Sequence, residues 1–286
     1  MAAVDLSVEE LSDLAVSKLG ELLAPVSSFT VLSPESERVK STGSSGGVYQ
    51  VEITNTLPTA ADNPDDYEAM TSGSQSNVSV TTANIAVMQK LTNLQQQQGI
   101  PFKTRVPDAA KALAAAVWDK CTAMMNGAGY TDAGQITSGA LTAANLGALR
   151  ASVDAPNVSL ILEHSEAGPV YPSDKNSFEL SEAGAYGFSA IHMVSNFTGG
   201  VTDQVALAAT PEAAVGVSGL PLQHSDAAQL VGTASIIENL TIESVGVPVE
   251  LRIWQNSGTK DLYLSLETVF GIAAADATAG AFLDHA

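Results

Sequence analysis

Apolar residues follow a helical period close to the N-terminus. Leucines from Leu11 to Leu23 fall near one helical face, with Leu14 among them, and Pro25 ends the run. Ser7 and Glu10 form a capping-box pattern ahead of these leucines. The pattern predicts a short amphipathic helix. Such a helix must dock on something, either on its own domain or on a neighbour.

A second segment predicts a longer helix of about 19 residues. Pro107 stands at the first-turn position, Asp108 beside it favours the helix dipole, and Asn126-Gly127 closes the segment as a C-cap. Its apolar residues recur at a spacing of three and four, and they are Ala110, Leu113, Ala114, Val117, Cys121 and Met124. The many alanines allow other backbones to approach this helix closely.

Two strand-like segments are separated by a long polar stretch. Val48–Thr54 alternates, with Tyr49 on its apolar face, and Asn77–Val87 is rich in Val, Thr and Ile. Asn55–Ser76 between them is polar and acidic. Loops of this length inside a compact domain are uncommon and usually functional. We therefore predict a long extended hairpin that reaches away from the body.

The remainder of the chain predicts a mixture of helix and strand. Thr142 caps a further helix that opens at Leu141. Three more segments are predicted strands, and these are Val158–Glu163, Ser189–Ser195 and Val205–Thr210. Val249–Trp254 and Leu262–Phe270 are predicted to pair across the turn Asn256–Thr259, before a small-residue segment, Gly271–Phe282. The fold class is therefore α+β.

Composition excludes several classes of protein. The 286 residues include 12 Lys+Arg and 31 Asp+Glu, a net charge of −19, which makes sequence-specific nucleic-acid binding a poor match. One cysteine can form neither an internal disulfide nor a cysteine-based zinc site. The chain lacks a signal-peptide pattern and any run near 18 apolar residues, so no membrane association is expected.

The sequence contains no strong candidate for a catalytic, cofactor-binding or metal site. No His-Glu-x-x-His occurs, and adjacency alone does not place His224-Ser225-Asp226 in triad geometry. Cys121 and His192 are better explained as buried side chains of the predicted helix and strand. Asp62, Asp65 and Asp66 lack the spacing of a calcium loop. We predict no catalytic, cofactor-binding or metal site, and no enzyme activity.

The order of the predicted elements resembles that of a known protein family, although no single motif does. A terminal helix arm is followed by a long hairpin, a lone Ala-rich helix, a mixed middle and a closing strand pair. The local sequence of four segments adds to this resemblance: Leu141–Leu149, Asn157–Leu162, Ala206–Val215 and Leu262–Ile272. The chain resembles the major capsid proteins of tailed double-stranded DNA bacteriophages, the HK97-like fold.

The resemblance implies a division of the chain. Residues 1–44 would form an N-terminal arm with a short helix, and 45–92 the extended E-loop hairpin. Residues 93–134 would form the P domain with its spine helix, 135–235 the A domain, and 236–286 the returning P-domain strands. Lys40 and Lys90 flank the hairpin, but no motif supports transferring the isopeptide crosslink of some relatives.

The resemblance also implies a function. The subunit would self-assemble as hexamers and pentamers into an icosahedral head shell around packaged DNA, which it would contact only non-specifically. It would be assembled in the host cytoplasm, reside in the virion, and have portal, scaffolding and cement proteins as further partners. The expected assembly contacts are Leu11, Leu14, Tyr49, Asp65, Asp66, Tyr67 and Pro211.

Two alternatives stay open at this stage. An encapsulin-like nanocompartment would share the fold and hold enzyme cargo, with a docking pocket that involves the N-terminal helix. A monomeric enzyme with an acidic surface would instead be compact. The shell hypothesis predicts that deleting Asn55–Ser76 leaves the body folded but weakens assembly. It also predicts that replacing Leu11 and Leu14 with Ala loosens the arm.

Overall fold

The computed structural model describes residues 8–33, 38–39, 47–56, 73–127, 129–137, 141–170, 186–194, 204–221 and 236–285. Its α-helices are α1 (Val8–Leu22), α2 (Asn93–Gln97), α3 (Val106–Gly127) and α4 (Ala143–Ala151). Its strands are β1 (Thr30–Leu32), β2 (Arg38–Val39), β3 (Gly47–Thr56), β4 (Ser74–Leu91), β5 (Thr131–Ile136), β6 (Ser159–Glu163), β7 (Ala190–Val194), β8 (Gln204–Ala209), β9 (Ala214–Pro221), β10 (Ile236–Ile242), β11 (Val247–Gln255), β12 (Leu262–Ala274) and β13 (Gly280–His285). Short 3-10 turns include η2 (Phe102–Arg105), η3 (His164–Glu166), η6 (Pro211–Ala213) and η7 (Ala277–Ala279).

The larger sheet has eight strands and is organised around β12. Its main path runs β1-β9-β12-β11-β10, and β4 pairs with β12. β11 and β12 form the predicted antiparallel pair, with Gln255 opposite Leu262. β9 was not predicted as a strand, because its eight residues are all buried and show no polar alternation.

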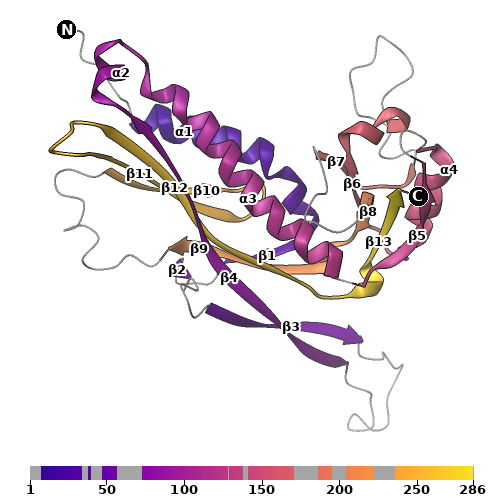
Figure 1. The fold of residues 1–286 in the computed structure, drawn as a ribbon. Coiled ribbons are helices and arrows are strands. Elements are labelled where there is room, and N and C mark those ends of the chain that lie inside the picture. Colours follow the sequence, from indigo (N-terminus) through magenta and orange to yellow (C-terminus); the bar gives the residue numbers. More distant parts are fainter. Residues whose placement is uncertain are drawn as a thin grey trace.

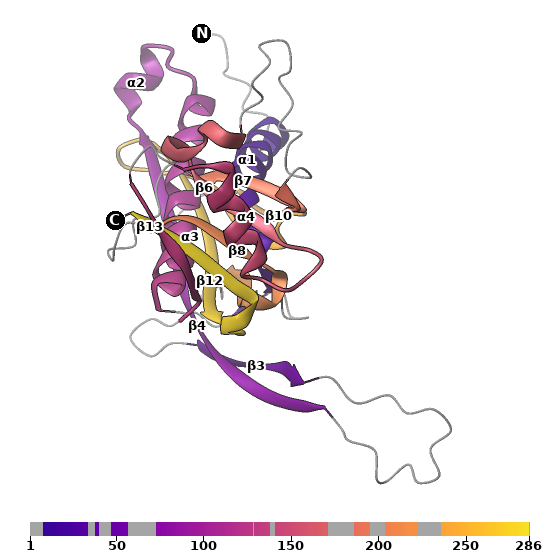
Figure 2. The ribbon, with the colours of Figure 1, turned by 90° about the vertical axis from the view of Figure 1, so that its right-hand side faces the viewer.

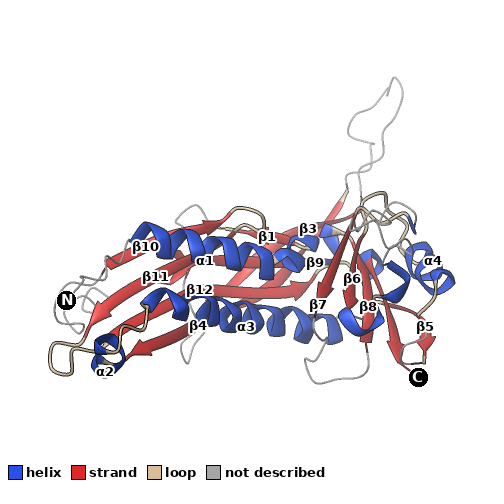
Figure 3. Cartoon of the chain, turned by 90° about the horizontal axis from the view of Figure 1, so that it is seen from above, coloured by secondary structure: helices blue, strands red, loops and turns tan. Residues whose placement is uncertain are grey.

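Two helices lie side by side across one face of this sheet (Figures 1 and 3). α3 contacts β12, β4 and α1, and α1 also contacts β10. The helix predicted from Pro107 is thus present as α3, and its Ala109, Ala110 and Leu113 are fully buried. The small side chains of Ala109 and Ala110 let the helix lie close to the sheet.

A smaller sheet of five strands, with the order β5-β13-β8-β6-β7, lies at the end of the molecule away from α2 (Figure 3). α4 packs against β13 and β8. Thr142 caps α4 as predicted, since its side chain accepts a hydrogen bond from the Asn145 backbone N–H while the Asn145 side chain accepts one from Thr142 N.

Besides α3, which leads from β4 to β5, two short segments connect a strand of one sheet to a strand of the other. η6 joins β8 to β9, and η7 follows β12 and leads into β13. The backbone N–H of Ala275 donates to Ala213 O and that of Asp276 donates to Glu212 O, at 3.0 and 3.2 Å. The final strand, expected among the returning P-domain strands, therefore lies in the smaller sheet. Gly280 permits this because an added Cβ would meet the Tyr130 ring at 2.8 Å.

Candidate assembly surfaces

The hairpin predicted around Tyr49 leaves the main sheet at one crossing point. β4 pairs with β12 from Leu91 to Ala83 and with β3 from Thr82 onward. At the divergence, the backbone of β4 lies directly against Gly271 of β12. A Cβ on Gly271 would come within 2.8 Å of the Thr81 carbonyl carbon and 2.9 Å of Thr82 Cα. Only glycine allows this approach, so the residue fixes where the hairpin departs.

The base of the hairpin has its own small core. Val80 of β4 packs with Val215, Val217 and Val269 of the main sheet, and all four are buried. Tyr49 is half-buried against this cluster. The rest of the hairpin projects beyond the body (Figure 2). Asp65, Asp66 and Tyr67 lie outside the described residues, so they stay predictions.

A groove of about 490 Å³ lies beside the hairpin base, next to the junction of the two sheets. Its apolar side chains come from β1, β3 and β9, and they are Leu32, Val51, Ile53 and Val215. Pro211 also lines it and is held there because Thr30 Oγ1 donates a 2.9 Å hydrogen bond to its carbonyl oxygen. The structure thus places Pro211 at the joint between the sheets.

Three carboxylates line the same groove: Glu52, Glu212 and Asp276. All three are exposed, and no Lys or Arg is among the groove's described lining residues. Sequence reasoning missed this groove, since its parts come from positions scattered over more than 200 residues. Only the acidic composition hinted that some carboxylates would gather without cations.

Leu11 and Leu14 belong to the packed body of the subunit rather than to a free arm. Leu11 is 2% exposed and belongs to the core beneath α1, together with Ala15 and Leu19. Leu14 is half-buried against the same core. The open question about the helix is thereby answered, because α1 docks on its own domain. Leu11 is accordingly not accessible to a neighbouring copy in this fold.

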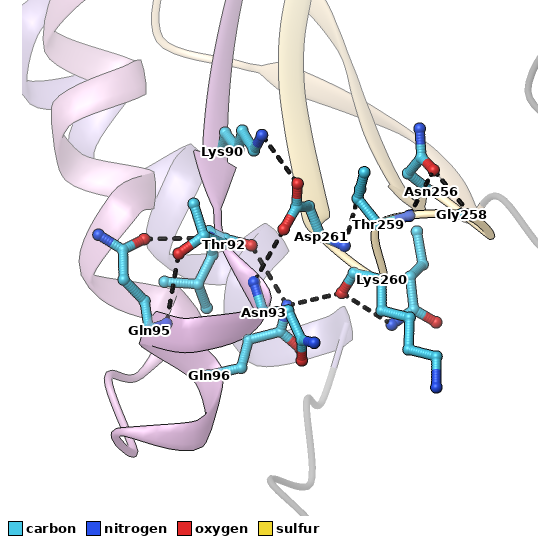
Figure 4. A network of polar contacts seen from close by, with 12 residues as sticks. Lys90, Thr92, Asn93, Gln95, Gln96, Asn256, Gly258, Thr259, Lys260 and Asp261 are labelled. Carbon is cyan, nitrogen blue, oxygen red and sulfur yellow. Dashed lines mark hydrogen bonds and ion pairs between the residues drawn. The ribbon is translucent and has the colours of Figure 1, made fainter.

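The opposite end of the main sheet is a polar tip built from α2 and the β11–β12 turn (Figure 4), and η2 follows α2 in the chain. Asp261 accepts a 2.8 Å hydrogen bond from the Asn93 backbone N–H and pairs with Lys90 Nζ at 2.8 Å. This ion pair with Lys90 is the main reason why the pKa of Asp261 is lowered. The side chain of Gln96 donates to Lys260 O, which ties α2 to the turn.

The tip also exposes cations and an apolar side chain. Lys103 and Lys260 are exposed, and neither forms an ion pair with another described residue. Leu94 of α2 is 64% exposed. The Lys90–Asp261 pair neutralises itself, while Asp108 in the first turn of α3 and Glu9 in the first turn of α1 are carboxylates at the same end of the two helices. The tip therefore presents two exposed lysines in a strongly acidic chain.

The groups that could carry chemistry are accounted for by packing. Cys121 is fully buried, and burial raises the pKa of its thiol. Burial has the opposite effect on His192 and lowers the pKa of its imidazole. His285 Nε2 lies 3.1 Å from Oε1 of the buried Glu166, linking β13 to η3. Among the described residues, no three His, Cys, Asp or Glu side chains gather as a metal site.

The structure does not describe the remaining candidates from the sequence. Asp62 and His224-Ser225-Asp226 lie outside the described residues, as does Lys40. No helix in the described part of the chain is long and apolar enough to cross a bilayer.

Comparison with known proteins finds similarity only at the level of structure. No protein-family model and no curated protein matches the sequence. Among solved structures, the virus-like particle from Pyrococcus furiosus is 12% identical, with a TM-score of 0.54 over 97% of this chain and 99% of that chain. The capsid of an empty GTA particle is 11% identical, with a TM-score of 0.52 over 93% of this chain and 90% of that one. The capsid of a native GTA particle gives 12% identity and a TM-score of 0.50 over the same shares. The chain therefore has the HK97-like α+β capsid fold.

Proposed function

We propose that this chain, which has the fold of HK97-like capsid proteins, is the major subunit of an icosahedral shell. The observation that carries the proposal is the coverage of the similarity. It extends over 97% of this chain and 99% of the virus-like-particle subunit, so nearly the whole of this sequence takes part in the shared fold. Shell formation needs surfaces that meet copies of the same chain, and it needs no catalytic constellation.

In this proposal the parts take capsid roles. The β3–β4 hairpin acts as the E-loop, and α3 with the larger sheet forms the P domain. The five-stranded sheet with α4 forms the A domain. The arm role is restricted to the residues before α1, because α1 itself packs on α3 and β10 of the same chain.

We assign the shell to the head of a tailed bacteriophage, assembled in the host cytoplasm, with double-stranded DNA as its content. The net charge of −19 supports weak, non-specific contact with the genome, since repulsion between carboxylates and phosphates favours packaging and release over tight binding. The subunits would associate as hexamers and pentamers, with portal, scaffolding and cement proteins as partners. No enzymatic role is proposed.

A second candidate is an encapsulin-like compartment that holds protein cargo instead of a genome. The similarity to a virus-like particle is the observation that favours it, because this particle has the highest TM-score of the structures compared above. The two candidates share the same shell and differ in what it contains.

Velocity sedimentation of the purified protein tests the proposal, with the fast fraction imaged by negative-stain electron microscopy. We expect hollow shells, or rings of five and six subunits. Nuclease-resistant DNA in particles from the native source would support the phage head, and co-purified protein cargo would support the compartment. A compact monomer that stays monomeric with its scaffolding protein added would overturn both.

A further inference from the structure

Two of the surfaces described above, the tip with its exposed lysines and the acidic groove, lie at opposite ends of the larger sheet. The tip lies at the Leu262 end of β12 (Figure 1), and the groove is lined by Ala275 and Asp276, which directly follow the Ala274 end. These ends are about 40 Å apart at roughly 3.3 Å per strand residue. A contact between tip and groove is therefore impossible within one chain.

The two surfaces are complementary in charge. The groove presents Glu52, Glu212 and Asp276 without a lining cation, and the tip presents Lys103 and Lys260 without an ion-pair partner among the described residues. Opposite potentials on two surfaces steer association and fix its register. Lys90 and Arg252 are already paired within the molecule, and the exposed Lys111 and Lys120 lie along α3 rather than at the tip.

The two surfaces are also complementary in shape and polarity. The groove has apolar walls that include Val51 and Ile53, and Leu32 beside them is 43% exposed. Leu94 of α2, in the tip, is 64% exposed. An apolar anchor in a pocket, surrounded by charged pairs, is the usual anatomy of a specific protein interface.

We propose that the tip of one copy docks in the groove of a second copy of this chain. Leu94 enters the apolar part of the groove while Lys103 and Lys260 face Glu52 and Glu212. The contact joins two different surfaces, so it is head-to-tail and builds closed rings or larger closed shells when the rotation closes. This inference rests on the proposed shell function and names the surfaces through which the copies meet.

A zero-length carbodiimide crosslink tests the contact in the unmodified protein. The reagent joins a carboxylate to an amine only where the two touch. In an equal mixture of unlabelled and 15N-labelled chains, we expect mixed-isotope crosslinks from Lys103 or Lys260 to Glu52 or Glu212. Lys111 and Lys120, exposed on α3, serve as internal controls and should not join these carboxylates.

Charge reversal tests the same contact by function. We expect Glu52→Lys with Glu212→Lys to lower the yield of assembled particles by ~10-fold or more, a change equivalent to one 1.4 kcal/mol step. Lys103→Glu with Lys260→Glu should do the same. The chain carrying all four changes should recover assembly, since both surfaces then have reversed and matching charge. The matched control is Glu238→Lys on β10 with Glu243→Lys in the turn that follows, both exposed positions, and it should assemble normally.

The outcomes separate this inference from the shell proposal. Shells that form without tip–groove crosslinks would overturn the docking inference and leave the shell proposal standing. Tip–groove crosslinks between copies that never build shells or rings would overturn the shell proposal and leave the docking inference standing. If the variant with all four substitutions folds, as judged by circular dichroism, but assembles no better than the variants with two substitutions, the inference is also overturned.

Discussion

Gly271 is the residue at which the hairpin and the main sheet touch through backbone atoms alone. We expect Gly271→Ala to lower the free energy of unfolding by about 1–3 kcal/mol, because the added methyl group must displace the Thr81–Thr82 backbone. Denaturant unfolding of the unassembled subunit measures this. Gly147→Ala on α4 is the control, since nothing lies within 4 Å of its Cβ, and it should be neutral or slightly stabilising. Equal effects of the two substitutions would contradict the role given to Gly271.

Asp261 carries a pH dependence that can be predicted in sign. Its pKa in the folded chain is lowered below the ordinary 3.8, mainly by Lys90, so its contribution to stability is present above pH 3.8 and is lost as pH falls through the folded pKa. We expect Asp261→Asn to lower the unfolding midpoint at pH 7 and to converge with the unmodified protein in acid. Asp154→Asn, at an exposed position, should show no such convergence. Parallel curves for Asp261→Asn and the unmodified protein down to pH 2 would contradict this assignment.

At the scale of the element, α1 is a structural part of the subunit body. Leu11→Ala should cost about 2–5 kcal/mol of unfolding free energy, because it leaves a cavity among residues that are fully buried. Leu22→Ala on the same helix removes a side chain that is 40% exposed and should cost far less. The measurement is made on the unassembled subunit. A Leu11→Ala chain with unchanged subunit stability but weaker shells would instead return α1 to the role of a clasp between neighbours.

At the scale of the whole molecule, the body and the projecting hairpin have separate tasks. Replacing residues 57–72 with a short glycine linker leaves β3, β4 and the cluster around Val80 intact. We expect an unchanged unfolding midpoint together with reduced shell formation, measured by sedimentation velocity. Normal shells from this variant would contradict the assembly role of the hairpin.

Local signals in the sequence determined several elements by themselves. Pro107 and the alanine spacing predicted α3, Thr142 predicted the start of α4, and the turn near Asn256 predicted the β11–β12 pair. Caps, turns and periodicity act over a few residues, so they can be interpreted without the fold. The order of these elements also indicated the capsid fold.

Other features were decided by tertiary structure alone. The sequence left open where α1 docks, gave no alternation for the buried strand β9, and showed only a small-residue segment where β13 forms in the smaller sheet. The groove brings together Glu52, Glu212 and Asp276, and the tip brings together Lys103 and Lys260. These groupings depend on contacts between segments far apart in the chain, where the pairing of whole sheets, rather than any local propensity, fixes which side chains meet.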